Sequence, residues 1–135
     1  MIRYFITFLV LFSTLFANDD YELKLYEKIF SSIYPSQKLK IYSDDTVSEL
    51  LKKSDMFIIV STCDDANILI GKNFSFDKKC TNKPQFATSY NSFINNENVI
   101  GAFYWRKGRP QIKFKKDILN KFNITLPKSL EKFSK

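Results

Sequence analysis

An apolar segment at the N-terminus limits how much of this chain can contribute to a folded domain. Arg3 precedes an apolar run from Tyr4 to Phe12, and Ala17 follows a few residues later. This layout is typical of a secretory signal peptide, with a positive start, a short apolar centre and a small residue at the cleavage site. A retained membrane anchor is the less favoured alternative, because a spanning helix needs about 20 apolar residues. We therefore expect a signal peptide over residues 1–17, cleavage after Ala17 and a periplasmic location.

The remaining chain has the size of one small domain. Cleavage after Ala17 would leave residues 18–135, which are 118 of the 135 residues. A domain of that length can bury a modest core. Apolar residues make up 44% of the chain and aromatic residues 16%, so the composition favours a folded domain over a disordered one.

The spacing of apolar residues predicts helices and strands that alternate along the first part of this domain. Residues 20–33 are expected to form a helix, because Tyr26, Ile29, Phe30 and Ile33 share one face. The other expected elements are a strand at Leu39–Tyr42, a helix from Thr46 to Lys53, strands at Met56–Val60, Asn67–Ile70 and Gln85–Tyr90, and a loop or helical turn at Ser92–Glu97. The two continuous apolar runs, at Met56 and Asn67, predict strands that are covered on both faces.

Residues 98–114 predict a β-hairpin. Alternation places Val99, Gly101, Phe103 and Trp105 on one face and Ile100, Ala102 and Tyr104 on the other. A tight turn is expected at Arg106–Arg109, where Gly108 can adopt a positive φ. Pro110 cannot donate a backbone hydrogen bond, so we expect the returning strand to begin beyond it. Two short helices, at Lys115–Phe122 and from Pro127 onward, complete the chain.

This order of elements indicates the fold class. Helices and strands alternate early, and a hairpin closes the sheet late. We therefore expect a single α/β (or α+β) domain, with a mixed sheet of about five or six short strands flanked by helices.

Two cysteines remain in the expected exported domain. In an oxidising compartment an even number of cysteines favours a disulfide, here between Cys63 and Cys80. Closing a loop of that length stabilises a fold by about 3 kcal/mol. Two redox-responsive thiols are the alternative. A metal site is disfavoured, because the chain contains no histidine and two cysteines alone do not hold zinc.

The sequence offers little for catalysis. Histidine, the commonest general base, is absent, and no phosphate-binding or nucleophile motif occurs. Acidic pairs stand at Asp19-Asp20, Asp44-Asp45 and Asp64-Asp65, each beside an expected element end, where aspartate commonly caps helices and starts turns. We expect a protein that is not an enzyme and that uses no cofactor or metal.

Positive charge gathers at the C-terminal end. Residues 106–135 hold ten lysines and arginines against Asp117 and Glu131, a net charge of +8. Such a segment suggests an acidic partner or an anionic envelope surface, and a solvated lysine-rich face is the plainer interpretation. Nucleic acid is a poor candidate for an exported protein.

The hairpin turn is the best candidate for a contact surface. Tyrosine, tryptophan and arginine dominate the energetics of protein interfaces. Two aromatic and three basic residues lie at the turn and its root, namely Tyr104, Trp105, Arg106, Lys107 and Arg109. The alternative is that Tyr104 and Trp105 pack in the core beneath a solvated basic turn.

The order of motifs resembles the YfiR-like periplasmic family. The similarity lies in the leading helix, the strand at Leu39–Tyr42 with its capped helix, the run Cys63-Asp64-Asp65-Ala66-Asn67-Ile68-Leu69-Ile70, and the closing strand, turn, strand and Leu-rich tail. The resemblance implies an α/β domain that binds the periplasmic part of a membrane signalling protein, typically a diguanylate cyclase, and represses it.

Two other functions stay open. A small periplasmic module could capture a solute for a sensor or transporter, or an envelope protein could use the basic C-terminal face on anionic lipid or wall polymer. The oligomeric state does not follow from the sequence.

Overall fold

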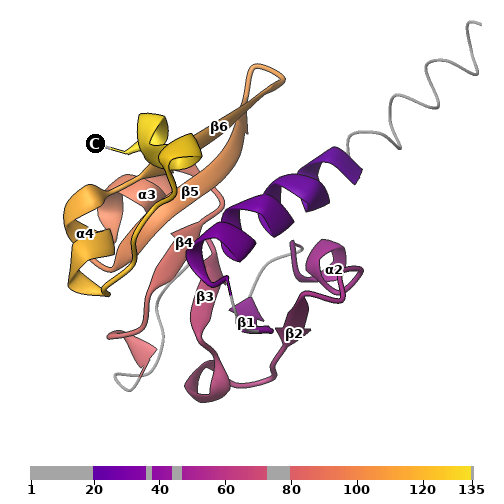
Figure 1. The fold of residues 1–135 in the computed structure, drawn as a ribbon. Helices are drawn as coiled ribbons and strands as arrows, with labels where there is room; N and C mark the ends of the chain where they lie inside the picture. Colours follow the sequence, from indigo (N-terminus) through magenta and orange to yellow (C-terminus); the bar gives the residue numbers. More distant parts are fainter. Residues whose placement is uncertain (1–19, 36–37, 44–46, 73–79, 135) are drawn as a thin grey trace, which may run out of the picture.

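The structure is a computed structural model that describes residues 20–35, 38–43, 47–72 and 80–134. The described strands form one six-stranded mixed sheet in the order β2-β1-β3-β4-β5-β6. Neighbouring strands run parallel except β5 and β6, which pair antiparallel. Helices flank this sheet (Figure 1), which confirms the expected α/β or α+β class. The expected signal peptide lies outside the described residues.

The elements follow the expected order with several shifted ends. A helix covers residues 20–33. The strands are β1 (Leu39–Ser43), β2 (Phe57–Ile59), β3 (Ile68–Gly71), β4 (Gln85–Ala87), β5 (Val99–Arg106) and β6 (Arg109–Phe114). The remaining elements are α2 (Val47–Leu51), α3 (Tyr90–Asn95), α4 (Lys116–Lys121) and the 3-10 helices η1 (Cys63–Asp65) and η3 (Lys128–Phe133).

The helix over residues 20–33 covers one face of the sheet, where it is the indigo helix of Figure 1. Its four predicted core residues are all buried, with Tyr26, Ile29 and Phe30 at 1% exposure and Ile33 at 7%. The ring of Tyr26 lies 5.2 Å from that of Phe103 on β5. The helix therefore joins strands that lie far apart in the sequence, and its predicted buried face is confirmed.

A second, smaller core lies on the opposite face. It contains Leu69, Ala87, Ala102 and Tyr104 from the sheet, Phe93 from α3 and the buried Cys80. Ser89 begins α3 as its N-cap, accepting a hydrogen bond from the N–H of Ser92 at 3.2 Å. This cap ends the extended backbone early, so β4 stops at Ala87 and not at Tyr90 as expected. The segment Ser92–Glu97, expected as a loop or a helical turn, begins within the helix α3.

The structure corrects the prediction for Met56–Val60. β2 covers only Phe57–Ile59 and lies at the edge of the sheet, with Ile58 39% exposed. The strand is therefore not covered on both faces. The apolar run alone could not reveal this, because the central position between β2 and β3 belongs to β1.

Two further corrections concern the hairpin. The pairing of β4 and β5 shifts by one residue, with Gln85 opposite Val99 and Phe86 opposite Gly101. Ile100 is the extra residue, so Val99 lies in the smaller core and Ile100 in the larger one, opposite to the expected faces. The predicted orientations from Gly101 to Trp105 agree with the two cores.

The returning strand begins at Arg109 and includes Pro110, which pairs with Trp105. Lys115 donates its N–H to the carbonyl of Ile100 at 2.9 Å, so odd-numbered residues of β6 direct their N–H groups toward β5. Pro110 occupies an outward position on an edge strand, where a missing N–H costs the sheet nothing. The expectation that the strand starts after Pro110 was therefore wrong.

The C-terminal segment also differs in kind from the expected helix. Residues from Lys128 form the 3-10 helix η3, with Pro127 as its N-cap residue. Leu130 is buried at 3% exposure, and Leu126 and Phe133 pack beside the larger core. Ser134 then forms a single parallel bridge with Phe114 on β6.

Candidate functional site

The hairpin turn presents three cations at one end of the sheet. Arg106 pairs with Arg109 across a two-residue turn in which Lys107 has φ 51° and Gly108 has φ 76°. Two positive φ values are the geometry of a tight hairpin turn, so the predicted turn is confirmed. The tip reaches beyond the neighbouring helices (Figure 1), and Arg106, Lys107 and Arg109 are all exposed.

Trp105 extends this tip with an exposed aromatic surface. Its side chain is 40% exposed, and its ring lies 5.8 Å from that of Phe103 in an edge-on arrangement. On the other side, its ring is 6.5 Å from that of Tyr21, which is 48% exposed. Trp105 is thus supported from beneath by the core and leaves a face open beside the cations.

Tyr104 takes the opposite face of β5. It is only 8% exposed, and its ring lies 6.0 Å from that of Tyr90. Its hydroxyl is buried and has no hydrogen-bond partner among the described residues. Of the five predicted contact residues, the structure therefore groups Trp105, Arg106, Lys107 and Arg109 on the exposed tip and places Tyr104 in the smaller core.

A groove of about 410 Å³ opens at the carboxyl ends of the parallel strands. Its walls come from the helix over residues 20–33, from α2 after β1, and from the ends of β3, β4 and β5. The chain reverses its direction of progress across the sheet at β1, since β2 lies on one side and β3 on the other. In open α/β sheets, ligands commonly bind outside the carboxyl ends of the strands at such a reversal.

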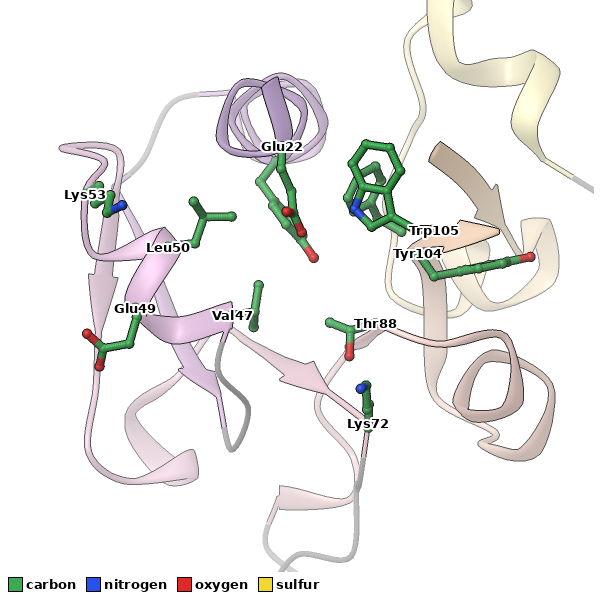
Figure 2. A pocket seen from close by; sticks show the side chains of 11 residues that line it. Glu22, Val47, Glu49, Leu50, Lys53, Lys72, Thr88, Tyr104 and Trp105 are labelled. Atoms are coloured by element: carbon green, nitrogen blue, oxygen red, sulfur yellow. The ribbon is translucent and has the colours of Figure 1, made fainter. Parts of the chain in front are cut away.

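Figure 2 shows the side chains that line the groove. Glu22 points into it from the helix over residues 20–33, and Lys72 approaches from the opposite wall. Thr88 lies next to Lys72, and Val47 and Leu50 provide apolar surface from α2. Trp105 lines the groove from the end of β5. The groove therefore offers charges of both signs above an apolar wall.

A second cavity of about 560 Å³ continues from this groove toward the hairpin. The two share Lys72, Thr88, Tyr104 and Trp105, and Arg106 lines the second one. Trp105 thus belongs both to the groove and to the exposed tip. Glu49, on the outer wall of the groove, is paired with Lys52 at 3.3 Å.

Glu22, Lys72 and Thr88 were not predicted as site residues from the sequence. These residues are distant in the sequence and are brought together only by the parallel order of the strands. One local signal was present: Lys72 and Thr88 directly follow buried strand residues, and the carboxyl end of such a strand is where polar site residues collect.

The predicted disulfide between Cys63 and Cys80 is present. The two Cα atoms are 6.0 Å apart, and the bridge joins η1, which precedes β3, to the segment that precedes β4. Lys83 reinforces the same junction, because its Nζ donates to the carbonyl of Ala66 at 2.7 Å and to the carbonyl of Asp64. A structural role fits this position, and the redox-responsive alternative stays open.

The acidic pairs form no common site in the described chain. Asp64 and Asp65 are exposed in η1, and Asp65 accepts a hydrogen bond from Thr62 at 3.0 Å. Asp19 and the pair Asp44-Asp45 lie outside the described residues. Within residues 20–35, 38–43, 47–72 and 80–134, no three His, Cys, Asp or Glu side chains gather as metal ligands, and no helix has the length and apolarity to cross a membrane.

Comparison with known proteins adds no family. No protein-family model matches the chain, and no curated protein matches it. The resemblance to the YfiR-like family therefore stays a prediction.

Proposed function

We propose that this chain is a non-enzymatic periplasmic regulatory protein that binds the periplasmic domain of a membrane signalling protein. In the form implied by the YfiR-like resemblance, the partner is a diguanylate cyclase or sensor that the bound protein represses. The contact surface is the hairpin tip, made of Trp105, Arg106, Lys107 and Arg109.

One observation carries this proposal. Trp105 leaves an open aromatic face beside Tyr21 and next to three exposed cations, at the end of β5 where the hairpin turn reaches beyond the neighbouring helices. Interfaces commonly concentrate their energy in a tryptophan or tyrosine anchor with arginine beside it. The cations would also speed association with an acidic partner.

The disulfide supports the proposed location. Bridges such as Cys63–Cys80 form and persist in oxidising compartments, including the periplasm. The side chain of Cys80 is 1% exposed, so the bridge is integrated into the smaller core rather than appended to the surface.

Site-specific crosslinking from the tip tests the proposal. A photo-reactive amino acid at Lys107 should crosslink the chain to a membrane-anchored signalling protein in intact envelopes. The same amino acid at the exposed Asp64, in η1, is the matched control and should not capture that protein.

A charge-reversal variant then measures the contribution of the tip. Arg106→Glu plus Arg109→Glu should weaken capture by at least about tenfold, because two favourable charges become repulsive. Lys116→Glu plus Lys128→Glu changes the net charge equally at positions away from the tip. Equal capture by the tip variant and by the unmodified protein would refute the proposed contact surface.

The capture of a small solute is the second candidate function. The groove beneath Trp105 favours it, because Glu22 and Lys72 face a common space that also has apolar walls. A solute that binds there should raise the melting temperature, and Lys72→Glu should abolish that shift for an anionic solute. A solute whose shift survives this change binds elsewhere.

A further inference from the structure

The outer edge of the hairpin carries another groove, which is separate from the tip and from the two cavities described above. It has a volume of about 410 Å³ and runs along β6 between α3 and η3. We call it the β6-edge groove. Its charged residues are Lys113, Lys115 and Lys132, and its apolar wall on the α3 side consists of Tyr90, Phe93 and Ile94.

Two of the three apolar wall residues of the β6-edge groove are exposed to solvent. Tyr90 is 49% exposed and Ile94 is 51% exposed, and both belong to the short helix α3. These are two of the five large hydrophobic side chains that are exposed in the described chain. Neighbouring exposed apolar side chains rimmed by polar groups are typical of an interaction surface.

Each lysine of the groove lies over an aromatic ring. The Nζ atoms of Lys113, Lys115 and Lys132 are 5.1, 5.0 and 5.2 Å from the ring centres of Tyr90, Phe93 and Phe133. Such contacts hold a cation in place while part of it stays available to an anion. The groove is therefore a positively charged surface whose charges are positioned in advance.

Among the described residues, no acidic side chain lines the β6-edge groove. Lys115 is also partly withdrawn from water: burial lowers its pKa, an effect that the nearby Asp117 carboxylate opposes. Its Nζ donates to the carbonyl of Asn96 at 3.1 Å, which leaves further donors for an incoming carboxylate. The charge of the groove thus complements an acidic ligand.

The backbone of β6 adds a second kind of recognition. Since odd-numbered residues of β6 direct their N–H groups toward β5, Ile112 directs its N–H and carbonyl outward. Within the described part of the chain, no acceptor is found for the N–H of Ile112. Pro110 has no N–H to offer on one side, and Ser134 already bridges Phe114 on the other. The open edge is therefore short and centred on Ile112.

We propose that the β6-edge groove binds an extended acidic segment of a protein partner, which pairs with Ile112 as an added strand. Acidic side chains of the segment then lie on the α3 side, next to Lys113 and Lys115. Apolar side chains contact Ile112 and Phe133 on the other side. A lipid surface or a phosphate polymer would meet the lysines but would have no peptide groups for the strand edge, so the observations favour a peptide.

This inference goes beyond the proposed function, because it requires neither the tip nor a membrane partner. It can fail while the tip proposal stands, and the reverse also holds. The tip variant Arg106→Glu plus Arg109→Glu should bind the acidic segment within about threefold of its charge-matched control.

A peptide-binding titration tests the inference on the intact protein. The probe is a blocked fluorescent heptapeptide in which four glutamates alternate with three valines, so that one face is acidic and the other is β-branched. Lys113→Glu plus Lys115→Glu should weaken its binding by at least about tenfold, and Lys116→Glu plus Lys128→Glu should have a much smaller effect. Lys113→Gln plus Lys115→Gln removes the two charges without reversing them and should give an intermediate loss of binding. This variant keeps the test decisive if the charge-reversed variant does not fold.

Three results would overturn the inference. The first is an equal loss in the groove variant and in its charge-matched control, which would indicate unspecific attraction. The second is unchanged binding when the central valines are N-methylated, because such a peptide cannot pair with Ile112. The third is displacement of the heptapeptide by inorganic polyphosphate at the same charge concentration as by the unlabelled peptide, which would identify a general polyanion surface.

Discussion

Gly101 on β5 packs so closely against β6 that adding one methyl group should strongly destabilise the fold. A Cβ atom at Gly101 would lie 2.6 Å from Cδ1 of Phe114 and 2.7 Å from the carbonyl oxygen of Lys113. Real Cβ atoms essentially never approach another heavy atom within 3.0 Å, so something must shift in Gly101→Ala. The Phe114 ring is 1% exposed and enclosed by the larger core, and the Lys113 carbonyl belongs to the strand backbone. Neither the Phe114 ring nor the Lys113 carbonyl can therefore move away without disturbing the core or the strand.

The expected loss follows from this geometry. Overpacking a core costs about 1–3 kcal/mol, and the upper end applies because one obstacle is backbone. A loss of about 3 kcal/mol in the free energy of unfolding corresponds to a fall of about 10 °C in the melting temperature for a domain of this size. The hairpin would have to separate at its root to make room.

A matched glycine makes the prediction specific. At Gly108, with φ 76°, an added Cβ would meet no atom within 4 Å, so Gly108→Ala tests backbone strain without crowding. That strain costs about 1–2 kcal/mol. Thermal and urea unfolding of both variants should therefore show the greater loss in Gly101→Ala, and Phe114→Leu should restore part of it in the double variant. A loss in Gly101→Ala equal to or below that in Gly108→Ala would refute the reasoning.

Three further predictions concern stability. Cys63→Ser plus Cys80→Ser should lower the free energy of unfolding by about 3 kcal/mol in urea titrations; an unchanged value would exclude a structural role for the bridge. Tyr104→Phe should raise it by about 1 kcal/mol, because it removes a buried hydroxyl without a partner in the described chain; a loss would show that the hydroxyl is satisfied. Burial raises the pKa of Tyr34 from 10.0 to about 12, so the folded protein holds this proton more tightly than the unfolded one. Stability should then fall between pH 10 and 12 by up to about 1.4 kcal/mol per pH unit, and Tyr34→Phe should flatten that part of the curve.

The sequence predicted correctly those features that depend on residues close together in the chain or on composition alone. The four-residue apolar face of the helix over residues 20–33, the turn at Gly108 and the Cys63–Cys80 bridge all follow from short-range spacing or composition, and the structure confirms them. Pro110 was misjudged because its tolerance depends on which way the N–H would point in the finished hairpin.

The order of the strands in the sheet could not be predicted from local sequence patterns. An apolar run reads the same for a central strand and for an edge strand, so the exposed Ile58 of β2 could not be foreseen. The groove of Glu22, Lys72 and Thr88 depends on that order as well, because three separate strand or helix ends meet there. The shift at Ile100 had no sequence signal, since Val99 and Ile100 are both apolar and either could face either core.

The placement of β1 has a consequence for how the chain acquires its shape. Both neighbours of β1 come later in the sequence, and the aromatic face of the first described helix meets Phe86 and Phe103, which come later still. An incompletely synthesised chain therefore exposes the apolar face of this helix until the hairpin has formed. We expect truncated products that end before β5 to aggregate or to be degraded, so the last third of the molecule acts as the closing step of assembly.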